Sequence, residues 1–192
     1  MIEQWLGNLD KLLTHDVPGG FSIYHHARAA FVAGDIEKAE KLKRLNYLLH
    51  NSEVPYTAQI GKNSILAYGG IGIILHDQTR IGERCNIGSG VTIGGSASGV
   101  PIIGHDVYLS TGCKILGGLK IGDGAIIGAN AVVLNDVKPF TVVAGLPAKP
   151  ISDITPANFD KYAGFYWCKN QPEKTSLFID WYFTQKRAEM PR

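Results

Sequence analysis

The stretch IIGHDVYLSTGCKILGGLKIGDGAIIGANAVVLNDV, residues 102–137, repeats with a period of six. Its repeating aliphatic residues are Ile103, Leu109, Ile115, Ile121, Ile127 and Val133. Four residues after each comes a small or apolar residue: Val107, Cys113, Leu119, Ala125, Ala131 and Val137. A period of six fits neither the 3.6-residue turn of a helix nor the alternation of a simple strand. It predicts a parallel β-helix, in which three six-residue units form one triangular coil and the aliphatic side chains stack inside.

The same period extends upstream, where the inward aliphatic residues are Ile81, Ile87 and Ile93. It is interrupted twice. Ten residues separate Ile93 from Ile103, and the four extra ones lie in SASGVP (96–101), which we expect to form a small, flexible loop that leaves the coil. A gap of 21 residues separates Ile60 from Ile81, so we expect irregular coiling near His76. Interruptions of a solenoid fall on one face and often carry function.

The repeats divide the chain into three parts. Residues 1–52 form a helical N-terminal segment, residues 53–150 the β-helix domain, and residues 151–192 an aromatic-rich, partly helical tail with a helix expected over 173–188. Helical spacing in the first part predicts three helices. The first contains Ile2, Trp5, Leu6, Leu9, Leu12 and Leu13, and the second ends at Gly34. The third is capped by Asp35 and presents Ile36, Ala39, Leu42, Leu45 and Leu49 on one face. We expect the tail to cap the open end of the β-helix or to pack between subunits.

The composition excludes several classes of protein. The 192 residues carry a net charge of only +2, which argues against a nucleic-acid-binding protein. Three widely spaced cysteines without a CxxC pair predict neither a disulfide framework nor a zinc ribbon. The sequence shows no signal peptide and no apolar run long enough to span a membrane, so we expect a cytoplasmic protein without a transmembrane segment.

The repeats, together with VTIGG at 91–95 and AGLPAKP at 144–150, resemble the left-handed β-helix acyltransferases. Within that superfamily, residues 53–151 are most similar to serine acetyltransferase. The resemblance implies an acetyl-CoA-dependent O-acetyltransferase that transfers an acetyl group directly to a hydroxyl of a small molecule. It also implies a homotrimer whose active sites lie between neighbouring subunits.

His76 is the candidate general base. Acyl transfer to a hydroxyl needs a base that is effective near pH 7, and the histidine pKa of about 6.5 suits that task. An acceptor must hold the second ring nitrogen. The resemblance places an aspartate eight residues before the first Ile-Gly glycine, and Glu53 occupies that position here. Asp77, the neighbour of His76, is the competing candidate.

The resemblance also assigns the coenzyme A contacts. Gly94 and Gly95 flank the thioester, where a backbone amide stabilises the oxyanion. The backbone of Thr111 and Ala129 contacts the pantetheine arm, and Lys149 lies near the nucleotide end. No catalytic thiol is expected, because Cys85 and Cys113 occupy the inward position of a rung.

The acceptor is left open by the sequence. In serine acetyltransferases, the loop that corresponds to 96–101 carries an Arg-His pair ahead of a proline. The arginine of that pair binds the serine carboxylate. In this chain, Gly99 and Val100 precede Pro101 instead. Asp77 and Arg80 are the candidate substrate-binding residues, with Arg80 as the nearest substitute for the missing clamp. A sugar or nucleotide-sugar acetyltransferase is therefore the alternative to a serine acetyltransferase, and a non-enzymatic β-helix scaffold is a more distant one.

No metal is expected, because the β-helix carbonic anhydrases need three histidines and the repeats contain only His76 and His105.

Overall fold

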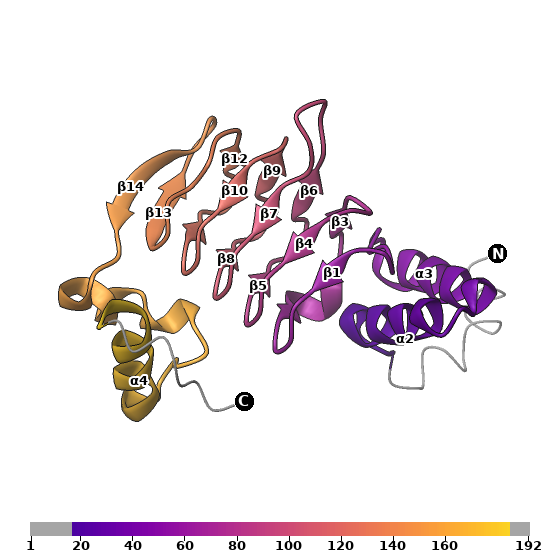
Figure 1. The fold of residues 1–192 in the computed structure, drawn as a ribbon, viewed down its shortest axis with the longest axis horizontal. Helices are drawn as coiled ribbons and strands as arrows, with labels where there is room; N and C mark the ends of the chain where they lie inside the picture. The colour runs from indigo at the N-terminus through magenta and orange to yellow at the C-terminus, as the bar shows by residue number, and fades with distance from the viewer. Residues whose placement is uncertain (1–16, 185–192) are drawn as a thin grey trace, which may run out of the picture.

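The computed structural model of the chain describes residues 17–184. They form a parallel β-helix flanked by helices at its N-terminal end and by a folded tail near its C-terminal end (Figure 1). The first predicted helix, with Ile2 and Trp5, lies outside the described residues. The strands are β1 (Gln59–Ile60), β2 (Ile65–Leu66), β3 (Ile74–Leu75), β4 (Arg80–Ile81), β5 (Asn86–Ile87), β6 (Thr92–Gly94), β7 (Ile102–Ile103), β8 (Tyr108–Leu109), β9 (Lys114–Leu116), β10 (Lys120–Ile121), β11 (Ile126–Ile127), β12 (Val132–Val133), β13 (Thr141–Ala144) and β14 (Lys149–Asp153). The helices are α2 (Gly20–Val32), α3 (Ile36–His50), η1 (Ala67–Gly70), η2 (Pro156–Lys161), η3 (Ala163–Phe165) and α4 (Pro172–Phe183).

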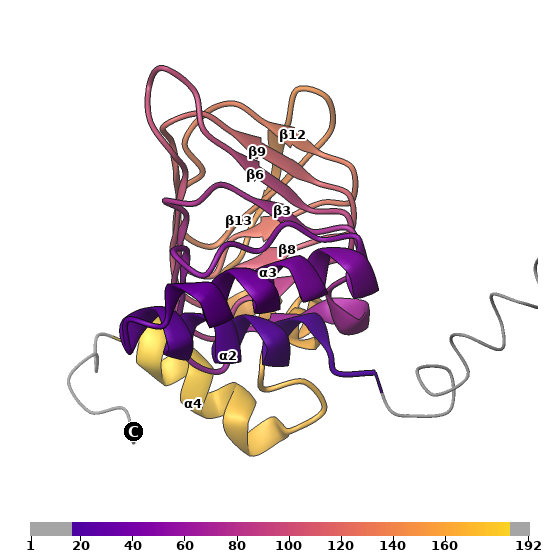
Figure 2. The same ribbon diagram turned by 90° about the vertical axis from the view of Figure 1, so that its right-hand side faces the viewer.

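The strands form three sheets, which are the faces of a triangular prism (Figure 2). Face 1 contains β1, β4, β7 and β10; face 2 contains β2, β5, β8, β11, β13 and β14; face 3 contains β3, β6, β9 and β12. Successive coils pair in parallel with matching register, so that Ile81 lies over Ile60 and under Ile103. The predicted inward aliphatic residues are buried, which confirms the six-residue period as the determinant of the core. We name each corner by the faces it joins, so that the chain leaves face 3 for face 1 at the 3–1 corner.

Stacked glycines allow the coils to approach closely at the corners. A Cβ atom on Gly82 would lie 2.4 Å from the carbonyl oxygen of Gly104 in the next coil. Real Cβ atoms do not come that close to a backbone atom, so a side chain there would force the two coils apart. The glycines that follow Ile81 and Ile103 on face 1 are therefore a packing requirement as well as turn residues.

The upstream interruption lies before β3. Leu66 and Leu75 are nine residues apart instead of six, and the extra residues form η1 at the 2–3 corner. His76 instead follows β3 in a regular position, and its backbone N–H donates to the Ile93 carbonyl at 2.9 Å. The predicted interruption is therefore present at the start of the stretch AYGGIGIILHDQTR (67–80), where we expected it, but it does not reach His76. The second interruption, 96–101, forms the predicted loop at the 3–1 corner.

The helical segment confirms two predicted helices and corrects one of their faces. Asp35 caps α3 through a hydrogen bond from the Lys38 backbone N–H at 3.0 Å. Ala39 is fully buried as expected, but Ile36 and Leu45 are exposed. Polar residues of α3 turn inward in their place: Asn46 donates to the Gly20 carbonyl at 3.1 Å, and His50 contacts the Pro18 carbonyl at 2.8 Å. Backbone carbonyls at and just before the start of α2 bind the Asn46 amide N–H and the His50 ring, which the spacing of apolar residues does not reveal, and Oδ1 of Asn46 is left without a hydrogen-bond partner among the described residues.

The aromatic tail packs against the outer surface of face 2. Phe159, Tyr166 and Phe178 form a buried cluster with Ile126 and Val142, which point outward from β11 and β13. The tail therefore covers a side of the prism and does not cap its end, and packing between subunits remains a prediction. The predicted helix over 173–188 is present as α4 over its described part.

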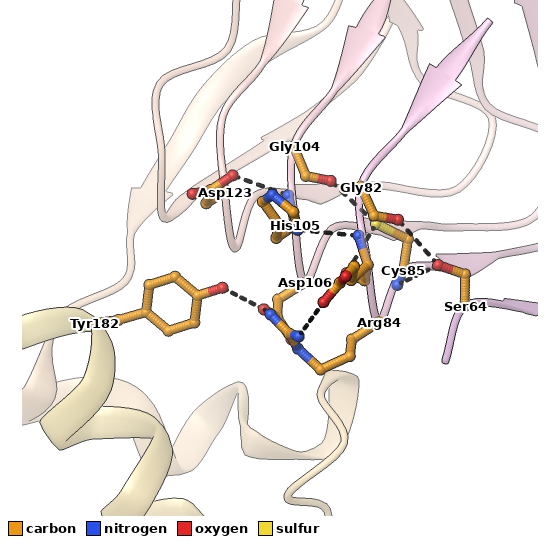
Figure 3. A network of polar contacts seen from close by, with 10 residues as sticks. Ser64, Gly82, Arg84, Cys85, Gly104, His105, Asp106, Asp123 and Tyr182 are labelled. Atoms are coloured by element: carbon orange, nitrogen blue, oxygen red, sulfur yellow. Dashed lines mark hydrogen bonds and ion pairs between the residues drawn. The ribbon is translucent and has the colours of Figure 1, made fainter. Parts of the chain in front are cut away.

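A polar network fixes this tail to the 1–2 corner (Figure 3). The guanidinium of Arg84 donates to the buried carboxylate of Asp106 through Nε at 2.9 Å and Nη2 at 2.8 Å. The Tyr182 hydroxyl of α4 donates to the same carboxylate. Burial and the nearby Asp106 charge raise the pKa of Tyr182. A paired and hydrogen-bonded buried charge of this kind specifies where the tail docks.

Candidate active site

The 3–1 corner brings together His76, Asp77 and Gly95. His76 and Gly94 occupy equivalent positions in successive coils, each directly after an inward aliphatic residue. The loop 95–101 leaves the corner immediately above His76, and Figure 2 shows it projecting from the prism. The only other long excursion in that view is the turn between β13 and β14, at the 2–3 corner.

The imidazole of His76 is held through one nitrogen. Its Nδ1 lies 2.8 Å from Asp77 Oδ1 and 3.2 Å from the backbone nitrogen of Gln78. A proton on Nδ1 satisfies the first contact, whereas an unprotonated Nδ1 satisfies the second. The shorter contact involves a full negative charge, so it favours the tautomer with the proton on Nδ1. That tautomer leaves Nε2 unprotonated and able to accept a proton.

Gly95 lies directly beside that free nitrogen. A Cβ atom on Gly95 would sit 3.1 Å from His76 Nε2 and 3.1 Å from Val100 Cγ2, so a larger residue requires the imidazole or the loop to shift by a few tenths of an ångström. Gly94 pairs with Leu116 in face 3, but the N–H of Gly95 has no acceptor among residues 17–184. Of the two predicted glycines, Gly95 is thus the one that lies beside the His76 ring and has a backbone N–H without an acceptor among the described residues.

The loop 95–101 is anchored, contrary to the expected flexibility. Ser96 and Gly99 exchange two backbone hydrogen bonds of 2.9 and 3.0 Å. The Ser98 hydroxyl accepts from the Gly118 N–H at 2.9 Å, and a Cβ on Gly118 would lie 1.9 Å from the Ser98 carbonyl oxygen. The loop is a closed hairpin seated on the corner of the next coil.

Glu53 has a different partner from the one expected. Its Oε1 lies 2.6 Å from Lys43 Nζ of α3, and this hydrogen bond raises the pKa of the lysine. No hydrogen bond or ion pair joins Glu53 to His76 among the described residues. Both side chains nevertheless line one pocket, together with Glu40, Lys43, Pro55, Tyr56, Thr57, Leu75 and Asp77, which we call the Glu53 pocket.

A second hollow lies on the other side of Thr57. It is lined by Thr57, Gln59, Gln78, Arg80, Val100 and Ile102, and we call it the Arg80 groove. Thr57 separates the two and is fixed by a 2.9 Å hydrogen bond from its hydroxyl to the Asp77 carbonyl. Arg80 therefore lies close to the base, as its place in the sequence indicated, and shares a groove with the loop residue Val100.

The remaining predicted residues lie at the 2–3 corner. Thr111 and Ala129 occupy this corner in successive coils, both exposed. Lys149 begins β14, beside the turn that Figure 2 shows at the same corner. Within one chain they are separated from His76 by the width of face 3. The structure thus brings the catalytic candidates together with Gly94 and Gly95, and leaves the other coenzyme A candidates, Thr111, Ala129 and Lys149, on the opposite edge of face 3.

Helix α3 contributes two side chains to the Glu53 pocket that the sequence did not predict as site residues. Lys43 and Glu40 line the Glu53 pocket, and Glu40 accepts a 2.7 Å hydrogen bond from the Tyr56 hydroxyl. The charged stretch of α3 resembles any solvated helix face, so no motif marks these residues. Cys85 and Cys113 are buried as expected, and burial raises the pKa of each thiol to about 12. Residues 17–184 contain no cluster of three metal-binding side chains and no helix long and apolar enough to cross a membrane.

Comparisons with known proteins agree with this architecture. Residues 101–135 match the family described as bacterial transferase hexapeptide (six repeats). The chain is 35% identical over 149 residues to a serine acetyltransferase of Bacillus licheniformis, covering 74% of this chain and 68% of that protein. The chain belongs to the serine acetyltransferase family. Its β-helix is accordingly of the left-handed type.

The chain matches only part of the length of these relatives. The chain is 31% identical to the Bacillus subtilis serine acetyltransferase, covering 59% of this chain and 54% of that one, so it spans about half of that relative. A solved serine acetyltransferase in complex with cysteine superposes with a TM-score of 0.67 at 27% identity, over 77% of this chain and 59% of that chain. Another, in complex with CoA, superposes with a TM-score of 0.62 at 28% identity, over 69% and 55%.

Proposed function

We propose that this protein is an acetyl-CoA-dependent O-acetyltransferase with His76 as its general base. The observation that carries the proposal is the contact between Gly95 and His76. Gly95, whose backbone N–H has no acceptor among residues 17–184, lies beside Nε2 of His76, and His76 lines a pocket. Direct acyl transfer needs this pair, a base for the hydroxyl proton and a donor for the oxyanion.

The reaction proceeds in two steps. His76 Nε2 removes the proton of the acceptor hydroxyl while that oxygen attacks the thioester carbonyl, and the resulting oxyanion accepts the Gly95 N–H. The intermediate then collapses, the C–S bond breaks, and the protonated imidazole returns its proton to the departing sulfur. The products are an acetyl ester and free coenzyme A. Asp77, 2.8 Å from Nδ1, stabilises the imidazolium during the reaction, and Glu53 remains the alternative orienting residue.

Coenzyme A binds across a subunit boundary in this proposal. Face 3 lies between the corner with His76 and the corner with Thr111 and Ala129, and exposed Ile74, Leu116 and Leu134 lie on it or at its edge. A threefold arrangement with face 3 toward the axis brings the 3–1 corner of one subunit against the 2–3 corner of the next. The pantetheine arm then contacts Thr111 and Ala129 of one subunit, with Lys149 near its nucleotide end. Relatives solved with CoA support the donor.

The acceptor is a small molecule with a hydroxyl group. The family name favours serine, whereas the absence of an arginine from the loop 96–101 favours a sugar or nucleotide sugar.

Thiol release from acetyl-CoA should be measured with L-serine, amino sugars and nucleotide sugars. His76→Ala is expected to lower turnover by roughly 10²–10⁴-fold at unchanged affinity for coenzyme A. The control is His105→Ala, because His105 is an exposed residue of the 1–2 corner. Equal losses in both variants would refute the assignment, and coenzyme A binding without turnover would favour a scaffold.

A further inference from the structure

The Glu53 pocket is lined by three carboxylates, and each of them has its own polar partner. The pairs are Glu40 with the Tyr56 hydroxyl, Asp77 with Nδ1 of His76, and Glu53 with Nζ of Lys43. Lys43 is the only lysine or arginine among the residues that line the pocket. Without its ammonium group, Glu53 would be the one carboxylate of the pocket that lacks a partner.

The backbone of Glu53 is fixed beside the strand that leads to His76. Its N–H donates to the Ile73 carbonyl and its carbonyl accepts from the Leu75 N–H, both at 2.9 Å, so Glu53 is the register partner of Ile74. Side chains alternate along an extended segment, so residues 74 and 76 point to the same outer side of the prism. Because Glu53 and His76 line one pocket, the direction of the Glu53 side chain decides whether its carboxylate faces α3 or the imidazole.

Helix α3 is held at this position by a second contact, one turn before Lys43. Glu40 accepts from the Tyr56 hydroxyl at 2.7 Å, and Arg28 of α2 donates to the Tyr56 carbonyl at 2.8 Å. Glu40 and Lys43 are three residues apart and therefore lie on the same side of the helix. The Lys43 side chain is 29% exposed, and its hydrogen bond to Glu53 raises its pKa, so the ammonium group stays charged throughout the neutral range. The ion pair thus has a defined geometry between α3 and the β-helix.

The pair matters for the charge around His76 more than for stability, because partly exposed ion pairs stabilise a fold only slightly. The charged and titratable side chains around the imidazole are Asp77 at its own corner, Glu53 and Tyr56 before β1, Glu40 and Lys43 on α3, and Arg80 on β4. The loop 95–101 contributes no charge. A second free carboxylate in this pocket would favour the protonated imidazole and would reduce the fraction that can act as a base.

We propose that Lys43 is a positioning residue for the base: by binding Glu53 it keeps this carboxylate away from the imidazole and leaves Asp77 as the one anionic partner of His76. Lys43 touches neither the acceptor nor coenzyme A in this scheme and acts only through Glu53. The effect on turnover rests on the proposed function. The effect on the protonation of His76 is measured in the free protein and does not depend on it.

Protonation is tested first, without substrate. The histidine Cε1 signals of the full-length protein are followed by NMR over the neutral pH range in the wild type, Lys43→Met, Glu53→Gln and the double variant. Removing the cation is expected to move the His76 midpoint up by about 0.3–1 pH unit, as one elementary charge does in a partly solvated pocket. Glu53→Gln should move it down, because Lys43 then lacks its counter-charge. The double variant should return close to the wild-type midpoint.

Two control variants separate this effect from a general change in α3. Lys43→Arg keeps the cation and should titrate like the wild type. Lys41→Met removes a lysine of the same helix that is 74% exposed, pairs with Glu37 and lies outside the pocket, so the His76 midpoint should not move. The His105 signal serves as an internal reference at the 1–2 corner. Equal midpoints in the wild type and Lys43→Met, or equal shifts in Lys43→Met and Lys41→Met, would overturn the inference.

Turnover then tests whether the released carboxylate reaches the imidazole. In the wild type, Asp77→Asn is expected to lower kcat by roughly 10–100-fold. In the Lys43→Met background the same substitution should cost at least about 3-fold less, because Glu53 can then take the place of Asp77, and a further Glu53→Gln should restore the full loss. The KM for acetyl-CoA should stay constant across the series.

An Asp77→Asn loss that is the same with and without Lys43 refutes the positioning role. If the wild type acetylates no acceptor, the proposed function is what fails, and the NMR titration still decides whether Lys43 keeps the charge of Glu53 away from His76.

Discussion

Asp77 Oδ1 lies 2.8 Å from Nδ1 of His76, and the backbone nitrogen of Gln78 lies 3.2 Å from the same Nδ1. The two partners demand opposite tautomers of the ring. With the proton on Nδ1, the imidazole donates to Asp77 and Nε2 is a base. With the proton on Nε2, the ring accepts from Gln78 and Nε2 could not act as the proposed base. Asp77 therefore decides which form faces Gly95.

Replacing Asp77 by Asn should make the inactive tautomer competitive. The asparagine amide can donate to Nδ1, as Gln78 already does, and both then favour a proton on Nε2. We expect kcat to fall by roughly 10–100-fold, less than for a buried triad aspartate because Asp77 is 62% exposed. Glu53→Gln is the comparison and should have the smaller effect, since Glu53 pairs with Lys43. A larger loss for Glu53→Gln than for Asp77→Asn would show that the glutamate orients the base.

Gly95→Ala tests the contact that carries the proposed function. The new methyl group would lie 3.1 Å from both His76 Nε2 and Val100 Cγ2, so the ring or the loop must shift. We expect kcat to fall at least 10-fold while the thermal midpoint changes little, because the loop lies at the surface. Gly164→Ala provides the control: a Cβ there meets nothing within 4 Å, and neither glycine has a positive φ. Full activity in Gly95→Ala would exclude the proposed position of the oxyanion.

Gly118→Ala tests whether the anchored loop matters for catalysis. Its Cβ would lie 1.9 Å from the Ser98 carbonyl oxygen, which displaces the loop that carries Gly95 and Val100. The expected result is a lower kcat, with His76 and the coils beneath it unchanged in their amide chemical shifts. Ser98→Ala removes the hydroxyl that accepts the Gly118 N–H and should have a milder effect of the same kind. Wild-type kcat in Gly118→Ala would mean that the loop position does not affect the reaction.

The interior of the β-helix was predictable because the repeat is local. Each coil presents the same inward positions, so the period of six alone identifies Ile103 and Val133 as buried, and Cys85 and Cys113 with them. The position of η1 was not predictable in this way. The 21-residue gap shows that extra residues exist, but several coil registers accommodate them, and only the pairing of Leu75 with Ile93 places them before β3.

The site was predictable only in part for a related reason. His76 was selected because an interruption of the coil was expected beside it, although it lies in a regular position, and Gly95 was taken from the family resemblance. Lys43 belongs to a helix outside the repeats, and no period relates it to Glu53. The inward turn of Asn46 and His50 depends on carbonyl groups at the start of α2, which only the tertiary structure brings near. The contacts that the sequence does not predict are therefore those made by α3, both within the helical segment and with the β-helix.

The buried thiols predict a pH dependence of stability. The pKa of Cys85 and of Cys113 is about 12 in the folded protein, against 9.0 for an ordinary thiol. The unfolded chain thus releases these protons first, so the stabilising effect is complete below about pH 9 and is lost as the pH rises to about 12. Each thiol should contribute a slope of roughly 1.4 kcal/mol per pH unit in that window. Urea unfolding between pH 8 and 11 should show a shallower slope for Cys85→Ala and Cys113→Ala than for the wild type. Identical slopes in the variants and the wild type would contradict the raised pKa values of the two thiols. Both variants should retain transferase activity, because neither thiol takes part in the proposed reaction.

Ile74→Glu tests the assembly that the proposed mechanism needs. Ile74 points outward from β3 on face 3 and is 49% exposed in the single chain. If face 3 packs around a threefold axis, the new carboxylate is buried without a partner, at a cost of several kcal/mol in each interface. We expect light scattering to show a monomer and thiol release to be lost, because the coenzyme A contacts and His76 then no longer meet.

Ile65→Glu is a close control, since Ile65 is the outward residue of the two-residue strand β2 on face 2 and is 50% exposed. That variant should remain trimeric and active. A trimer in Ile74→Glu together with a monomer in Ile65→Glu would place the interface on face 2 and would separate His76 from Thr111 and Ala129. The shared active site would then have to be rebuilt around a different pair of corners.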